Sequence, residues 1–173
     1  ERILSMVDSV LLVVDAVDGP MPQTRFVTSK AFANGLNPIV MINKIDRDGA
    51  RPDWVVDEVF ELFDQLGATD KQVDFPIVYG SAIEVRDGLS MDAIEDDMSC
   101  LMQSILDNVP APDVELEAPF QMQVSALDYN SYVGVIGIGR IQRGTVKKGA
   151  SVSIISADGD LRKGKVLQVM GYQ

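Results

Sequence analysis

Hydrophobic residues in the first two thirds of the chain gather in short, nearly continuous runs that end in polar or small residues. Runs of this length predict strands. A run that is apolar at most positions, rather than at every second one, predicts a strand buried on both faces, as in a parallel sheet. These runs cover Val7–Val14, Pro38–Ile42 and Phe75–Tyr79.

Segments with apolar residues at helical spacing separate these strands. Asp53 is the expected N-cap of one such helix, and Asn34-Gly35 suits the end of another. Strands that alternate with helices predict βαβ units and a parallel α/β sheet. The helices are expected at Pro22–Ala33, Trp54–Leu66 and Cys100–Val109, with the end of a further helix at Glu1–Met6.

The pattern changes at Pro110–Pro119, which is rich in proline and acidic residues and predicts a semi-rigid linker. Beyond it, alternating residues and glycines within β runs predict a small β-barrel or its first half. The fold class is therefore α/β followed by all-β, with domains at 1–112 and 113–173. The expected strands are Gln121–Val124, Tyr132–Arg143, Val152–Ile155 and Lys165–Val169, with a hairpin turn at Asp158–Asp160.

The loop Asn43-Lys44-Ile45-Asp46 follows the second apolar run directly. Open α/β sheets bind ligands just outside the carboxyl ends of their strands. Asp46 can offer two oxygens to the paired N–H donors on one edge of guanine, and Asn43 can serve the O6 and N7 acceptors on the opposite edge. The stem of Lys44 can lie over the base. The loop therefore predicts guanine recognition; the alternative is a polar turn without a ligand.

Composition narrows the function classes. The 173 residues include no histidine, which removes His-based general base catalysis and His metal sites. The single Cys100 excludes an internal disulfide and fits a reducing compartment. No apolar run approaches the ~18 residues that span a membrane, and no secretory leader is visible. We expect a cytoplasmic protein with no membrane partner.

The charge pattern bears on nucleic acids. A net charge of −11 disfavours sequence-independent binding to phosphate backbones, and we expect no DNA partner. Positive residues nevertheless concentrate in the second half. Two interpretations of them stay open, ordinary barrel surface and a contact for RNA. These residues are Arg140, Arg143, Lys147, Lys148, Arg162, Lys163 and Lys165.

Two other patterns imitate functional sites. Gly159–Val166 nearly matches the phosphate-binding pattern Gly-x-x-x-x-Gly-Lys-Ser/Thr, but Val166 lacks the hydroxyl and a strand, not a helix, is expected there. The acidic run Glu95-Asp96-Asp97 suits a solvated face rather than a cation site. We therefore expect neither a phosphate loop nor a metal site in this chain.

Longer motifs carry a family resemblance. Asn43–Asp46 after one strand and Gly80-Ser81-Ala82 after the next resemble the paired guanine-recognition motifs of GTPases, and Gly139–Gly149 in the second half resembles the barrel of a translational GTPase. The stretches Asp18–Val27, Gly49–Val55 and Leu127–Gly134 narrow the resemblance to the TypA/BipA GTPases of bacteria, over essentially the whole chain.

The resemblance implies the rear half of a P-loop-GTPase-type domain followed by a truncated translation-factor-type β-barrel. It implies that Asn43 and Asp46 bind guanine, that Lys44 packs on the base, that Ser81 supports the loop, and that the backbone N–H of Ala82 meets O6. The implied ligands are GTP or GDP with Mg²⁺. The implied partner is the ribosome, through rRNA and ribosomal proteins, with roles in ribosome assembly, stress and virulence-type adaptation.

The resemblance also places the P-loop, both switch regions, the Mg²⁺ ligands and the catalytic histidine before the first residue of this chain, and further domains after its last. Those parts hold the phosphates, whose positioning and electrostatic stabilisation make up most of phosphoryl-transfer catalysis. We therefore expect a full-length GTPase but no catalytic residue, no metal ligand and no GTP hydrolysis in this chain alone. The alternative is a non-enzymatic module that binds the ribosome or RNA.

Overall fold

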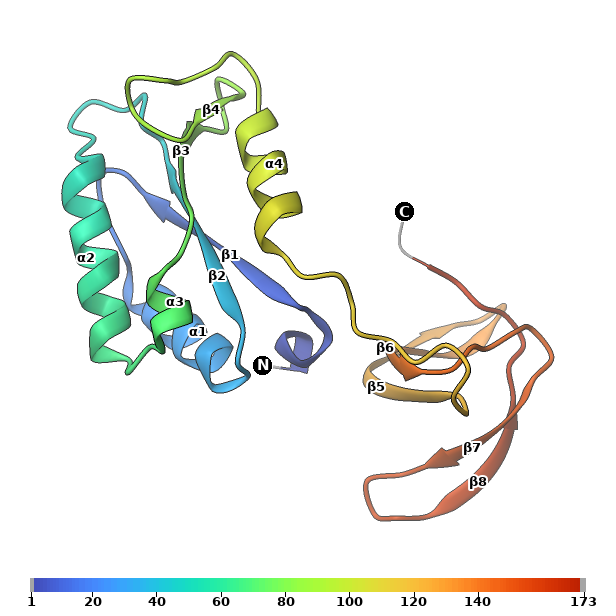
Figure 1. Ribbon diagram of the computed structural model, residues 1–173. Coiled ribbons are helices and arrows are strands. Elements are labelled where there is room, and N and C mark those ends of the chain that lie inside the picture. Colours follow the sequence, from blue (N-terminus) through green and yellow to red (C-terminus); the bar gives the residue numbers. More distant parts are fainter. Residues whose placement is uncertain (1, 172–173) are drawn as a thin grey trace. The chain divides into compact units, whose positions relative to one another are not determined.

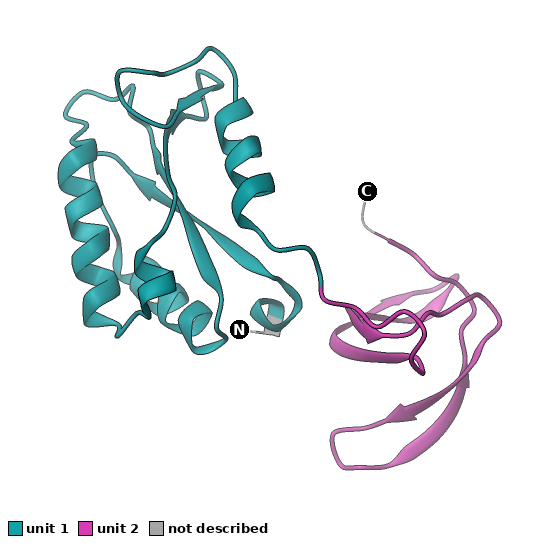
Figure 2. Cartoon of the chain, in the orientation of Figure 1, with its two compact units in different colours: residues 1, 3–112 teal, residues 2, 113–173 magenta. Residues whose placement is uncertain are grey.

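The structure, a computed structural model, describes residues 2–171. The chain divides into two compact units, Ile3–Pro112 and the part from Asp113 onward (Figure 2). The first unit contains helices and a mixed sheet, and the second contains antiparallel strands alone. The predicted fold class, α/β followed by all-β, is therefore confirmed.

The sheet of the first unit has four strands in the order β1-β2-β3-β4 (Figure 1). The first three are parallel, and the fourth runs antiparallel to β3. Each of the predicted buried runs supplies one parallel strand, although β3 lies two residues further along the chain than expected. The strands are β1 Ser9–Asp15, β2 Asn37–Asn43, β3 Ile77–Ser81 and β4 Arg86–Gly88.

Helices connect these strands. The predicted helix Pro22–Ala33 has its predicted bounds, and the helices predicted at Trp54–Leu66 and Cys100–Val109 are present with bounds shifted by one or two residues. The predicted helix end at Glu1–Met6 is a 3-10 helix from Arg2 onward, and Glu1 lies outside the described residues. The prediction that Asp53 is the N-cap of α2 is wrong. The helix begins at Pro52, with Arg51 at the cap position, because a proline fits the first helical position and has no N–H to satisfy there. The helices are η1 Arg2–Met6, α1 Pro22–Ala33, α2 Pro52–Gln65, α3 Asp70–Val73 and α4 Ser99–Asn108.

The core lies on both faces of β2, whose side chains point alternately to opposite sides. Val40 and Ile42 belong to the cluster that contains the buried face of α2, while Met41 packs with Val78 and Leu101 of α4. Helices α2 and α4 therefore cover opposite faces of the sheet (Figure 1). Each fully buried aliphatic or aromatic side chain contributes about 1.5–3 kcal/mol, so this double layer fixes the position of β2.

The second unit consists of two hairpins, each a separate two-stranded antiparallel sheet. The register of the first hairpin shifts between Val124 and Ala126, and Val124 pairs with Gly139. The predicted strand Lys165–Val169 is wrong, because the strand ends at Lys165. Closure into a barrel stays a prediction. The strands are β5 Gln121–Asn130, β6 Gly134–Arg143, β7 Ser151–Ile155 and β8 Leu161–Lys165.

Candidate functional site

Polar residues end three neighbouring strands at the same edge of the sheet. Asp15 at the end of β1 pairs in register with Asn43 at the end of β2, and Asn43 pairs with Gly80 near the end of β3. The strands are parallel, so these residues and the loops that follow them share one edge (Figure 1). This edge is where open α/β sheets bind ligands.

The side chain of Asn43 joins two loops. Its Oδ1 accepts a hydrogen bond from the N–H of Lys44 at 2.8 Å and another from the N–H of Ala82 at 3.1 Å. Its Nδ2 has no hydrogen-bond partner among residues 2–171. The two stretches that resemble guanine-recognition motifs are therefore in contact. Within residues 2–171 the Nδ2 donor of Asn43 stays available for a ligand.

Lys44 adopts a left-handed backbone conformation with φ 66°, which is uncommon for a residue with a side chain. Such conformations cost about 1–3 kcal/mol and persist where the surroundings hold them. Here the Lys44 N–H is bound to Asn43, and its Nζ lies 2.7 Å from Asp15 Oδ2. Lys44 is thus held both at its backbone N–H and at its side-chain ammonium group.

Asp15 is the most heavily bonded acid of the site. Its Oδ2 accepts from Lys44 Nζ and, at 3.1 Å, from Arg47 Nη1, while its Oδ1 accepts from the N–H groups of Val17 and Asp18 at 2.8 and 3.3 Å. Burial alone would raise the pKa of Asp15. The hydrogen bonds from Lys44 and the two backbone groups, with the positive charge of Lys44, outweigh it and lower this pKa to about 2.

Hydrogen bonds and close packing hold the end of β3 and the turn that follows it. Ser81 is fully buried, and its Oγ accepts a hydrogen bond from the N–H of Glu84 at 3.3 Å. The carbonyl of Gly80 accepts from the N–H of Ile45 at 3.4 Å. A Cβ at Gly80 would lie 2.8 Å from the carbonyl oxygen of Arg86, so β4 packs too closely for a side chain at this position. The two loops are therefore joined by backbone as well as side-chain bonds.

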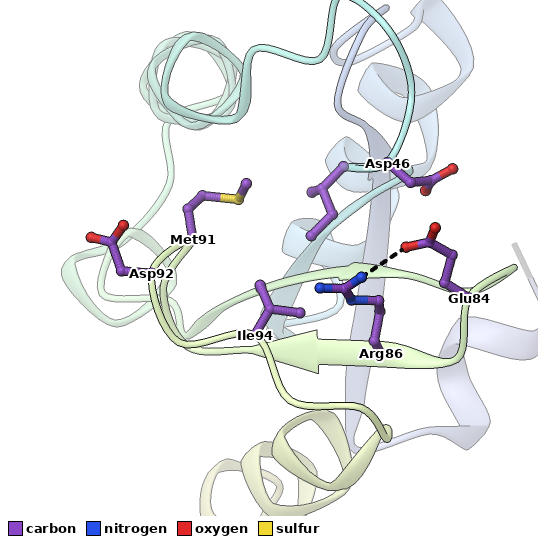
Figure 3. Close-up of a pocket in the computed structure, with 7 residues that line it drawn as sticks. Asp46, Glu84, Arg86, Met91, Asp92 and Ile94 are labelled. Carbon is purple, nitrogen blue, oxygen red and sulfur yellow. Dashed lines mark hydrogen bonds and ion pairs between the residues drawn. The ribbon is translucent and has the colours of Figure 1, made fainter.

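Asp46 stands apart from this network. Its side chain is exposed, and within residues 2–171 no hydrogen bond or ion pair engages its carboxylate. A pocket of about 380 Å³ adjoins it, formed by this loop on one side and by β4 with the chain after it on the other (Figure 3). In the pocket Arg86 Nη1 lies 3.3 Å from Glu84 Oε2. The pocket is lined by Ile45, Asp46, Glu84, Arg86, Met91, Asp92 and Ile94.

The structure thus brings together all five residues singled out in the sequence, Asn43, Lys44, Asp46, Ser81 and Ala82, at one edge of the sheet. Sequence reasoning missed Asp15 and Arg47. A signal for Asp15 was available, because it ends the first apolar run as Asn43 ends the second, and parallel neighbours end at the same edge.

The other sequence patterns lie elsewhere. Gly159 sits in the turn between β7 and β8, and the strand β8 contains Gly164 and Lys165, so no helix N-terminus follows this pattern. Among residues 2–171 no group of three or more acidic, cysteine or histidine side chains is placed to hold a metal ion. Within the same residues no helix is long and apolar enough to cross a membrane.

Comparison with known proteins finds a matching domain family and named relatives. Residues 1–111 match the elongation factor Tu GTP binding domain. Relatives named large ribosomal subunit assembly factor BipA are 66% identical in Escherichia coli K12, 63% in Haemophilus influenzae Rd and 57% in Buchnera aphidicola of Schizaphis graminum. Each alignment covers 172 residues, or 99% of this chain but 28% of the relative.

Proposed function

Since this chain belongs to the family of the elongation factor Tu GTP-binding domain and, within it, to the TypA/BipA group, we propose that it is the base-recognition segment of a translational GTPase. Its ligands are GTP and GDP. The chain supplies the part of the site that selects guanine. The observation that carries this proposal is the Asp46 carboxylate, which has no partner within residues 2–171, in a loop that Asn43 fixes to Ala82.

Each of the three polar residues of the loop has a defined task in this proposal. Asp46 accepts from N1–H and the exocyclic amine of guanine, a donor pair that adenine lacks. The free Nδ2 of Asn43 donates to the opposite edge, where guanine carries N7 and O6. The methylene stem of Lys44 lies over the base while its ammonium group stays on Asp15.

Ser81 and Ala82 complete the base site from the β3 side. Ser81 holds the turn after β3 through its bond with Glu84. The N–H of Ala82, which the resemblance assigns to O6, donates to Asn43 Oδ1 here. In the proposal, O6 shares or takes over this donor when the base enters, since Asn43 and the base approach it from the same edge of the sheet.

The phosphates need groups of another kind. No Gly-x-x-x-x-Gly-Lys-Ser/Thr occurs in the 173 residues, and the described residues offer no cluster suited to Mg²⁺. Hydrolysis depends on such groups to position the γ-phosphate and neutralise its charge. We assign base selection to this chain, and GTP hydrolysis with Mg²⁺ to the full-length protein.

We further propose the ribosome as the partner of the full-length protein, through rRNA and ribosomal proteins, and the cytoplasm as its compartment. Relatives that are 57–66% identical to this chain carry the name large ribosomal subunit assembly factor BipA. We assign residues 1–112 to the GTP-binding domain and 113–173 to a β-barrel domain. The basic residues of the second part, among them Arg162 and Lys163 of β8, suit contact with RNA phosphates.

The test is competition for the site in the full-length protein. A fluorescent GDP analogue should be displaced by GDP and GTP, and not by ADP or ATP at about a hundredfold higher concentration, because adenine offers no donor pair to Asp46. Equal displacement by ADP would overturn base selection. Ribosome binding without any nucleotide binding would favour the alternative, a non-enzymatic ribosome- or RNA-binding module.

A further inference from the structure

Asp15 contacts Lys44, the residue whose stem lies over the base in the proposed function. We propose that Asp15 is a positioning residue whose carboxylate binds Lys44 and Arg47 together and so sets the Asn43–Asp46 loop in its base-receiving shape before nucleotide arrives. This inference rests on the proposed recognition of guanine.

The carboxylate of Asp15 is fully committed to its neighbours. One oxygen receives both cations, at 2.7 Å from Lys44 and 3.1 Å from Arg47, and the other receives two backbone N–H groups. Only 14% of the Asp15 side chain is exposed, against 51% for Lys44 and 47% for Arg47. Asp15 is therefore the fixed member of the group, and the two cations are held by it.

The turn that carries Asp15 is itself backed by rigid contacts. The N–H of Arg51 donates to Ala16 O at 2.8 Å, and Arg51 Nη2 donates to Val17 O at 3.1 Å. The Arg51 guanidinium stacks on the Trp54 ring, 3.9 Å from its centroid. A Cβ at Gly19 would lie 3.1 Å from that ring. The stretches around Gly19 and Trp54 thus pack together and fix the turn after β1.

The consequence is a loop that is ordered in advance. Lys44 holds an unfavourable φ of 66°, and its flexible side chain is anchored at the ammonium end. Ordering a long side chain on binding costs affinity, and a ligand that finds it ordered avoids that cost. Asp15 therefore acts on affinity for the base through Lys44, and not on the phosphates.

Asp15→Asn distinguishes the binding of the two cations from the support of the turn after β1. Asparagine keeps an oxygen for the N–H groups of Val17 and Asp18 but loses the negative charge. In the full-length protein, titration with a fluorescent GDP analogue should show a Kd about three- to tenfold higher with an unchanged number of sites per chain. A general loss of folding would instead reduce the number of sites. Asp15→Ser, which keeps a short acceptor, serves if the first variant does not fold.

A double-mutant cycle identifies Lys44 as the intermediary. In the Lys44→Met background, Asp15→Asn should raise Kd by a smaller factor than in the unaltered protein, because the pair with Lys44 is already absent and only the pair with Arg47 is left to lose. Asp48→Asn is the matched control, since Asp48 lies in the same loop and forms no ion pair within residues 2–171, and it should leave Kd unchanged.

Three results separate the possible outcomes. An unchanged Kd in Asp15→Asn, or an equal rise in both backgrounds, would overturn the role of Asp15 while leaving guanine recognition intact. No saturable binding of the GDP analogue by the unaltered protein would overturn the proposed function, and this inference with it. A rise in Kd that is smaller in the Lys44→Met background supports the proposal.

Discussion

Asn43 and Ala82, 39 positions apart in the sequence, are joined by a hydrogen bond of 3.1 Å from the Ala82 N–H to Asn43 Oδ1. This bond links the loop after β2 to the end of β3. It brings the two motifs together, and within the described part of the chain the Asn43 amide nitrogen has no hydrogen-bond partner. The pair therefore couples the shape of the site to its chemistry.

Asn43→Ala should weaken binding of guanine nucleotides by the full-length protein by about tenfold or more, because it removes two bonds that hold the loops and one donor to the base. Isothermal titration with GDP measures this. Asn34→Ala is the matched control: its amide donates once, to Lys30 O, beyond the site. Equal affinity in Asn43→Ala and the unaltered protein would refute the coupling.

The Asp15 interactions should make stability depend on acid pH. Folding lowers the Asp15 pKa from 3.8 to about 2, so its stabilisation is present above pH 4 and is lost as pH falls from about 4 to 2. Because Lys44 is half exposed, we expect about 1–2 kcal/mol. Urea unfolding of the unaltered chain and Asp15→Asn between pH 3 and 6 should show a difference that narrows below pH 4. A difference in unfolding free energy that stays constant from pH 3 to 6 would contradict this role of Asp15.

Gly139→Ala should destabilise the hairpin of β5 and β6. An added Cβ would collide with the carbonyl oxygen of Gln123, and relief would need a backbone shift worth about 1–3 kcal/mol. Gly137→Ala is the control in the same strand, where the nearest atom would be Val124 Cγ2 at 3.4 Å. Hydrogen exchange of the β5 and β6 amides measures the opening free energy. Equal exchange rates in the two variants would count against the close approach.

The 173-residue chain by itself should not hydrolyse GTP. The proposal gives its residues the selection of the base, and no Gly-x-x-x-x-Gly-Lys-Ser/Thr occurs among them. Phosphate release by a pure sample should equal that of a buffer blank, with the full-length protein as the positive control. Clear turnover by the chain alone would show that groups within these residues perform the chemistry.

The sequence predicts much of the first unit because its strands are buried on both faces. Continuous apolar runs became β1, β2 and β3, and helical spacing located α1, α2 and α4. Strand β4 was missed because Arg86-Asp87-Gly88 has no strand pattern and is held by distant contacts. The fully buried Asp87 accepts the N–H groups of Cys100 and Leu101 at the start of α4, at 3.2 and 2.7 Å, which no local pattern indicates.

The candidate site divides in the same way. Asn43, Lys44 and Asp46 were predicted because their residue types suit guanine and because they follow a buried strand. The use of Lys44 could not be predicted in full, since its ammonium group lies on Asp15, 29 positions earlier in the chain. The contact between Lys44, directly after β2, and Asp15, at the end of β1, is a tertiary contact. Only the register of β1 against β2 specifies it.

The most direct test of guanine recognition is a change of base preference at Asp46. Asp46→Asn in the full-length protein replaces one carboxylate acceptor by an amide donor, and xanthine carries a carbonyl where guanine has its amine. Competition against a fluorescent nucleotide gives the ratio of Kd for GTP to Kd for xanthosine triphosphate. We predict weaker GTP binding, tighter xanthosine triphosphate binding and a shift of this ratio by at least about tenfold, the size of one charge-assisted hydrogen bond. An unchanged ratio would contradict the assignment of Asp46 to the base.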